Sequence, residues 1–159
     1  MVPDLSSRVV LVFDDEMFAR LFAVQIFLDL GFTVLEAGSA EEGLDVLDRN
    51  DDVDLLFTDI SMPGEMDGLG LVRHVRAVSP DMALLVTSGH VQPPAELLPE
   101  GSLFLAKPYT AHALLTAIGE AAALLERKNH DLIGTAPLSG RGSRPMAGAP
   151  LMSVTLLAK

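Results

Sequence analysis

The chain has 159 residues, 49% of them hydrophobic, which is enough for one globular domain with a buried core. A net charge of −11 argues against direct binding to nucleic acid, and no apolar run approaches the roughly 20 residues that a membrane helix needs. Cysteine is absent, and residues 1–7 lack the basic start and apolar core of a signal peptide, so we expect a cytoplasmic protein with no membrane partner.

Hydrophobic periodicity predicts strands and helices that alternate along the chain. The strands are expected at residues 8–13, 32–36, 54–58, 82–87 and 102–106. Helices are expected at residues 17–30, 39–47, 68–78 and 110–126, with Gly31 ending the first, Ser39 and Glu42 forming a capping box on the second, and Thr110 capping the last. Residues 91–100 contain three prolines, so any helix there should be short or irregular.

This alternation predicts the class of fold. Strands separated by helices of such length imply right-handed crossovers and a parallel sheet covered on both faces, so we expect an α/β domain of five βα units over residues 1–127. Residues 1–126 hold 21 acidic and 6 basic side chains, whereas residues 127–159 hold 1 acidic and 5 basic ones. This change, with many Gly, Ser and Pro residues, predicts a low-complexity and largely unstructured tail at residues 128–159.

Charged side chains stand at the ends of three of the predicted strands. Asp14 and Asp15 follow the first strand, Asp59 follows the third, and Lys107 follows the fifth. In a parallel sheet the carboxyl ends of the strands share one edge, where ligands bind, so we expect these four side chains to converge.

The predicted cluster favours phosphoryl chemistry at a metal. Three crowded carboxylates repel one another, and Mg²⁺, which prefers oxygen ligands, would relieve that repulsion. A carboxylate can also accept a phosphoryl group as an acyl phosphate, and a lysine can neutralise a phosphoryl oxygen.

Four segments, in order, resemble the receiver domain of two-component response regulators. They are Phe13-Asp14-Asp15-Glu16, residues 59–68 (DISMPGEMDG), Val86-Thr87-Ser88-Gly89 and Ala106-Lys107-Pro108-Tyr109. The resemblance covers residues 8–126 and implies a flavodoxin-like, doubly wound sheet with strand order 2-1-3-4-5.

The resemblance also implies a role for each site residue. Asp59 would be the phosphoacceptor, charged by the phosphohistidine of a sensor histidine kinase or of a phosphotransfer protein. Asp15, Asp59 and the backbone carbonyl of Ser61 would hold Mg²⁺, with Asp14 acting through a metal-bound water. Lys107 would contact the phosphoryl group, and its bond to Pro108 is often cis in such domains.

A conformational switch is implied as well. Thr87 would move toward the phosphoryl oxygen and let the aromatic ring of Phe104 turn inward, a two-state change that a partner protein could read. We therefore expect a stand-alone response regulator that signals to another protein, and a signalling phosphoacceptor rather than an enzyme.

Two alternatives and one further hypothesis stay open at this point. The chain could be an aspartate-nucleophile phosphatase, although Glu16 and Ser61 stand where such enzymes carry a second aspartate. It could also be a receiver that acts as a phosphate sink or an adaptor. The segment Leu151 to Leu157 could dock on the acidic body or on a partner, although a tail without a role is the simpler interpretation.

Overall fold

The computed structural model describes residues 5–61, 67–89 and 92–134 of the chain. Within these residues the strands are β1 (Val9–Phe13), β2 (Thr33–Ala37), β3 (Leu55–Asp59), β4 (Ala83–Ser88) and β5 (Leu103–Ala106). The helices are α1 (Met17–Asp29), α2 (Ala40–Arg49), α3 (Gly68–Val78) and α4 (Ala111–Gly134), with a short 3-10 helix, η1 (Ala95–Leu97). Each predicted strand agrees within one residue at either end.

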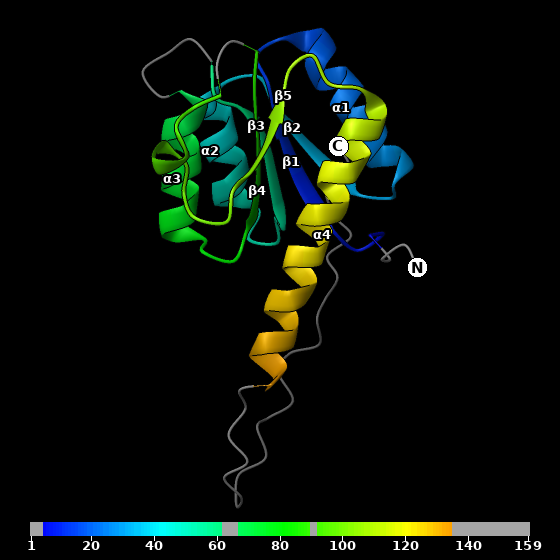
Figure 1. The fold of residues 1–159 in the computed structure, drawn as a ribbon, viewed down its shortest axis with the longest axis vertical. Helices are drawn as coiled ribbons and strands as arrows, with labels where there is room; N and C mark the ends of the chain where they lie inside the picture. The colour runs from blue at the N-terminus through cyan, green and yellow to red at the C-terminus, as the bar shows by residue number, and fades with distance from the viewer. Residues whose placement is uncertain (1–4, 62–66, 90–91, 135–159) are drawn as a thin grey trace, which may run out of the picture.

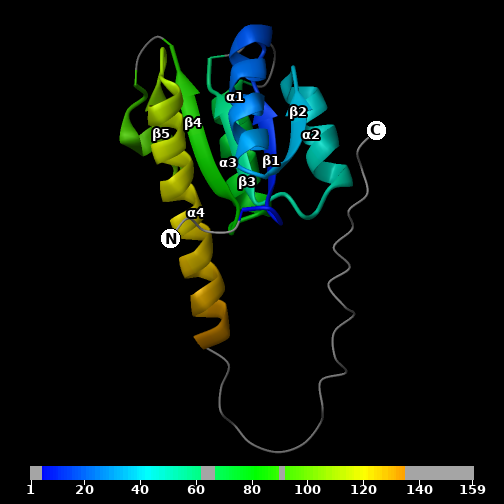
Figure 2. The ribbon, with the colours of Figure 1, turned by 90° about the vertical axis from the view of Figure 1, so that its right-hand side faces the viewer.

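The five strands form one parallel sheet in the order β2-β1-β3-β4-β5, as predicted. Apolar residues occupy every position of β1, which is buried on both faces as the central strands of a covered parallel sheet must be. Helices α1 and α4 cover one face of the sheet, and α2 and α3 cover the other (Figures 1 and 2). The strand order reverses beside β1, because β2 lies on one side of β1 and β3 on the other. Ligands of open parallel sheets bind at such a switch point, beyond the carboxyl ends of the strands.

Two layers of apolar side chains fill the space between helices and sheet. Phe27, Phe57 and Ile118 lie in the layer beneath α1 and α4. Phe13 and Leu71 lie in the layer beneath α2 and α3. Because successive residues of a strand point to opposite faces, Val12 contributes to the first layer and its neighbour Phe13 to the second.

The predicted caps are present where local sequence specifies them. The Ser39 hydroxyl accepts the amide of Glu42 at 3.2 Å, and Thr110 Oγ1 accepts that of Ala113 at 3.1 Å. The Glu42 carboxylate, however, accepts the amide of Gly38 at 2.8 Å. The Glu42 side chain therefore binds the amide of Gly38, one residue before the Ser39 cap, where a regular capping box would bind the amide of Ser39.

Two connections depart from a regular βα repeat. The segment between β4 and β5 carries only the three-residue η1, in line with the proline content of residues 91–100. Helix α4 extends to Gly134, so the predicted end near Glu126 is wrong. No glycine or proline interrupts residues 127–133, and a change of charge does not by itself end a helix. Residues 135–159, most of the predicted tail, lie outside the described residues.

At about 1.5 Å per residue, the 24 residues of α4 span roughly 36 Å, and the helix reaches past the edge of the sheet (Figures 1 and 2). In the described part of the chain, no helix is both long enough and apolar enough to cross a membrane.

Candidate functional site

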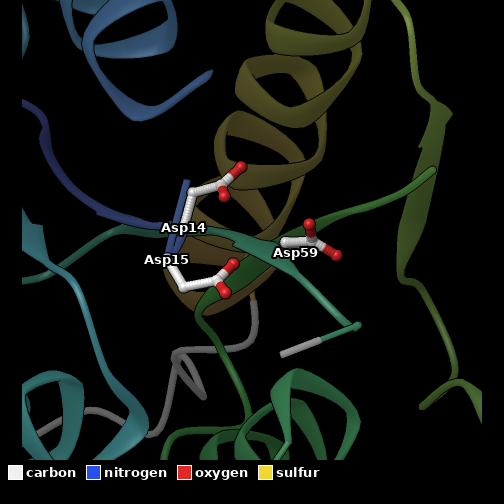
Figure 3. Close-up of side chains that lie close together, drawn as sticks. All are labelled: Asp14, Asp15 and Asp59. Atoms are coloured by element: carbon white, nitrogen blue, oxygen red, sulfur yellow. The ribbon is translucent and has the colours of Figure 1, made fainter. Parts of the chain in front are cut away.

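The carboxylates predicted to converge do so at the carboxyl edge of the sheet. Asp14 and Asp15 follow β1, and Asp59 ends the neighbouring strand β3 (Figure 3). One oxygen atom from each side chain lies within 4.8 Å of the other two. Asp14 and Asp59 are buried, whereas Asp15 is exposed. Three oxygen donors this close, one of them open to solvent, suit a hard divalent cation such as Mg²⁺.

Lys107 joins two of these carboxylates from the end of β5. Its Nζ donates to Asp14 Oδ2 at 2.8 Å and to Asp59 Oδ2 at 2.7 Å. Burial disfavours the charged ammonium, but the hydrogen bonds and negative charges of Asp14 and Asp59 outweigh it and raise the pKa of Lys107. The lysine is therefore a fixed positive charge at neutral pH. The Lys107–Pro108 peptide bond is cis, as expected.

The main chain around Asp59 is held closely. Asp59 Oδ1 accepts the amide of Ser61 at 2.8 Å, so Ser61 lies beside the carboxylate, although the predicted role of its carbonyl stays a prediction. Gly68, the first residue of α3, approaches the backbone of Asp59 so closely that an added Cβ would overlap the carbonyl oxygen. Residues 62–66, where Met62-Pro63-Gly64 predicts a turn, lie outside the described residues.

Thr87 lies on β4 directly opposite Asp59 in the strand register. It is fully buried, and its Oγ1 has no hydrogen-bond partner within the described part of the chain. A buried hydroxyl without a partner is uncommon because burial removes its hydrogen bonds to water. The structure thus places the predicted switch residue beside the predicted phosphoacceptor, with an unused donor.

Phe104 lies on β5 opposite Val86. It is half-buried and packs against the apolar layer beneath α2 and α3. Strand β4 therefore lies between Phe104 and Asp59, and the inward turn of the Phe104 ring stays a prediction.

Three neighbours of the cluster received no role in the site from the sequence alone. Arg20 Nη1 donates to the carbonyl oxygen of Asp14 at 2.6 Å, and the amide of Glu16 donates to Asp14 Oδ1 at 2.9 Å. Tyr109 packs with its ring 6.0 Å from that of Phe22 and lies beside the lysine. A cation one helical turn after an acidic pair is the signal that could have pointed to Arg20.

Comparisons with known proteins agree with this geometry. The family model of the response regulator receiver domain matches residues 10–119. The sensor kinase CckA of Brucella abortus is 35% identical over 131 residues, which cover 79% of this chain and 13% of that protein. A chemotaxis protein CheY homologue of Campylobacter jejuni is 33% identical over 139 residues, 84% of this chain and 96% of that protein.

A solved structure of a response regulator receiver domain protein from Clostridium thermocellum superposes with a TM-score of 0.62 at 30% identity. The superposition covers 77% of this chain and 98% of that one. Against CckA, by contrast, the chain spans only 13% of the relative's length, so the match there is to one part of a larger protein. Receiver domains are signalling phosphoacceptors, and this chain belongs to the family of response regulator receiver domains.

Proposed function

We propose that the chain receives a phosphoryl group on Asp59 from a phosphohistidine of a sensor histidine kinase or of a phosphotransfer protein, and then signals by contact with another protein. The observation that carries this proposal is the convergence of Asp14, Asp59 and Lys107, which stand at the ends of three different strands, within direct hydrogen-bonding distance. We propose a stand-alone regulator because the match to a CheY homologue covers 96% of that protein and 84% of this chain.

In the transfer, a carboxylate oxygen of Asp59 attacks phosphorus and the phosphorus–nitrogen bond to imidazole breaks. The bonding electron pair returns to the imidazole nitrogen, and the product is an acyl phosphate. Ser61 and Lys107 each hold one oxygen of Asp59, so the nucleophile is oriented before the donor arrives. The ammonium of Lys107 then lies where it neutralises a phosphoryl oxygen.

Asp14, Asp15 and Asp59 would hold Mg²⁺, because their oxygens lie within 4.8 Å of one another and are the donor type that this cation prefers. The carbonyl of Ser61 is the further ligand that we propose, with Asp14 acting through water. When bound, the cation supplies positive charge that offsets the repulsion between the carboxylates and the incoming phosphoryl group.

We propose Thr87 as the group that senses phosphorylation. Its buried hydroxyl has no partner among the described residues, and it stands opposite Asp59 on the adjacent strand. A phosphoryl oxygen on Asp59 would offer this donor the acceptor that it lacks, which would favour a shifted position of β4. Phe104, on the next strand, is the residue that we propose to respond, because it is packed but not fully buried.

The surface of α1 supports a protein as the phosphodonor. This helix is apolar on both its inner and outer faces, and Phe18 is 75% exposed on it. Met17, Leu21 and Phe22 are exposed on the same helix, which begins two residues after the acidic pair Asp14-Asp15. Exposed apolar patches of this kind mark protein interaction sites, and docking there would bring a phosphohistidine to Asp59.

Phosphotransfer assays test the proposal and its alternatives. Candidate kinases should label the wild type with one phosphoryl group per chain and leave Asp59→Asn unlabelled. Phe18→Ser should slow transfer from the protein donor but not from acetyl phosphate, since only the former docks on α1. Multiple turnover of a small phosphomonoester would instead indicate a phosphatase. If beryllofluoride with Mg²⁺ left the amide resonances around Thr87 and Phe104 unchanged, a phosphate sink or adaptor would be the better description.

A further inference from the structure

Arg20 connects the acidic pair to the neighbouring strand. It lies one turn into α1, and its Nη1 donates to the carbonyl oxygen of Asp14 at 2.6 Å. Its Nε lies 3.4 Å from Glu36 Oε2, on β2. One planar guanidinium therefore contacts two groups on adjacent strands, which the single ammonium of a lysine could not match with the same geometry.

The chain leaves room for this guanidinium at the end of β2. A Cβ built on Gly38 would lie 3.3 Å from Arg20 Nη1, which is closer than such contacts ordinarily are. Gly38 is itself tied down, because its amide donates to Glu42 at 2.8 Å. The position of Arg20 thus rests on a small residue as well as on its two oxygen partners.

The carbonyl that Arg20 binds belongs to the peptide unit between Asp14 and Asp15. Asp14 itself is already held on its side chain, where Oδ1 accepts the amide of Glu16 and Oδ2 accepts Lys107. Asp15, in contrast, is exposed. The direction in which its side chain leaves the backbone depends on the orientation of the peptide unit before it.

We propose that Arg20 is a positioning residue, which holds the Asp14–Asp15 peptide so that the Asp15 carboxylate stays directed at the metal site. This inference rests on the proposed binding of Mg²⁺ at that site. Residues that orient ligands without touching the metal typically change metal affinity by about 10–100-fold when they are replaced. Geometry, not the positive charge alone, is the origin of the effect, so a lysine should not replace Arg20.

Two measurements on the full chain test this role. Isothermal titration with Mg²⁺ compares wild type with Arg20→Met, Arg20→Lys and the control Arg49→Met, which removes an exposed positive charge from the far end of α2. We expect both Arg20 variants to bind Mg²⁺ about tenfold more weakly, and Arg49→Met to match wild type. Glu36→Ala, which leaves Arg20 in place, should give a smaller loss.

Amide hydrogen exchange of the metal-free proteins provides the second measurement. The amide of Glu16, which donates to Asp14 Oδ1, should exchange faster in both Arg20 variants than in wild type. Wild-type affinity in Arg20→Lys would overturn the proposal, because charge alone would then suffice. If wild type bound no Mg²⁺, the proposed function would fail at its metal, and hydrogen exchange alone would decide. Unchanged protection of the Glu16 amide in Arg20→Met would then refute the positioning role, and a loss of that protection would support it.

Discussion

Replacing Lys107 by methionine removes the charge at the centre of the site while it keeps a side chain of similar length. The ammonium contacts Asp14 and Asp59 at 2.8 and 2.7 Å, and the exposed fractions of the three side chains are 15%, 0% and 8%. The variant would leave two buried carboxylates side by side, with Asp15 nearby and no cation between them. Such a change should destabilise the metal-free protein.

The expected magnitude follows from the burial of the pair. Removing one partner of a buried ion pair costs about 3–5 kcal/mol. The site lies at the edge of the sheet and Asp15 is exposed, so water should relieve part of this cost, and we expect about 3 kcal/mol. For a chain of this size, each kcal/mol lowers the Tm by about 2–4 °C, so the Tm should fall by roughly 6–12 °C.

Urea unfolding in the presence of a chelator, followed by circular dichroism, measures this difference. Lys128→Met is the matched control, because the Lys128 ammonium donates to the carbonyl oxygen of Pro80 at 2.9 Å and forms no ion pair with another described residue. The loss of stability there should stay below about 1 kcal/mol. Adding Asp59→Asn to Lys107→Met should recover much of the stability, since it removes one of the two opposed charges. A loss below about 1 kcal/mol for Lys107→Met, or no recovery in the double variant, would refute the reasoning.

The pH dependence of this difference has a definite sign. Burial is outweighed by the hydrogen bonds and charges of the two aspartates, so the pKa of Lys107 is raised in the folded state. A raised pKa contributes stability that is fully present below the unfolded value of about 10.4 and is lost only as pH rises through the folded value. The difference in free energy of unfolding between wild type and Lys107→Met should therefore stay constant from neutral pH to about pH 10 and become smaller above it.

Three other predictions use different parts of the site. Tyr109 is the single tyrosine, and the chain has no tryptophan. Burial, chiefly, raises the pKa of Tyr109 to about 12, so tyrosinate absorbance should not develop near pH 10. The free energy of unfolding should fall as the pH rises from about 10 to about 12, because the folded state keeps the proton that the unfolded state loses. Gly68→Ala should lower the free energy of unfolding by about 2 kcal/mol or more and should reduce phosphorylation. The control Gly119→Ala, with nothing within 4 Å of the new Cβ, should be neutral or stabilising in urea unfolding. Mg²⁺ at about 100 times its Kd should add about 2.7 kcal/mol to wild-type stability and far less to that of Asp15→Asn; equal gains would contradict the metal assignment.

The position of the site could be predicted from the sequence because strand ends are marked strongly. Continuous apolar runs such as residues 9–13 can only be buried, so the charges that follow them must lie at an edge of the sheet. With parallel pairing, Asp14, Asp59 and Lys107 then come to the same edge whatever the details of the helices. The order of the strands followed from the family resemblance and not from any local pattern.

Other features could not be read locally. Arg20 follows the acidic pair by one helical turn, but that spacing alone assigns it no role, and the role that we propose also depends on Glu36, which β2 brings beside it. In the sequence Gly68 resembles any turn glycine. A glycine is required there because the backbone of Asp59, nine residues earlier, leaves no room for a Cβ. The end of α4 was placed too early because composition was taken as a boundary, although residues 127–133 contain no helix breaker.

The most direct test of the account is to locate the phosphoryl group itself. The full chain would be incubated with a phosphoramidate and Mg²⁺, reduced with borohydride to trap any acyl phosphate, and digested for mass spectrometry. The account predicts one modified residue, Asp59, with the modification abolished in Asp59→Asn and strongly reduced in Lys107→Met. Modification at another aspartate in the wild type, or undiminished modification in Asp59→Asn, would contradict it.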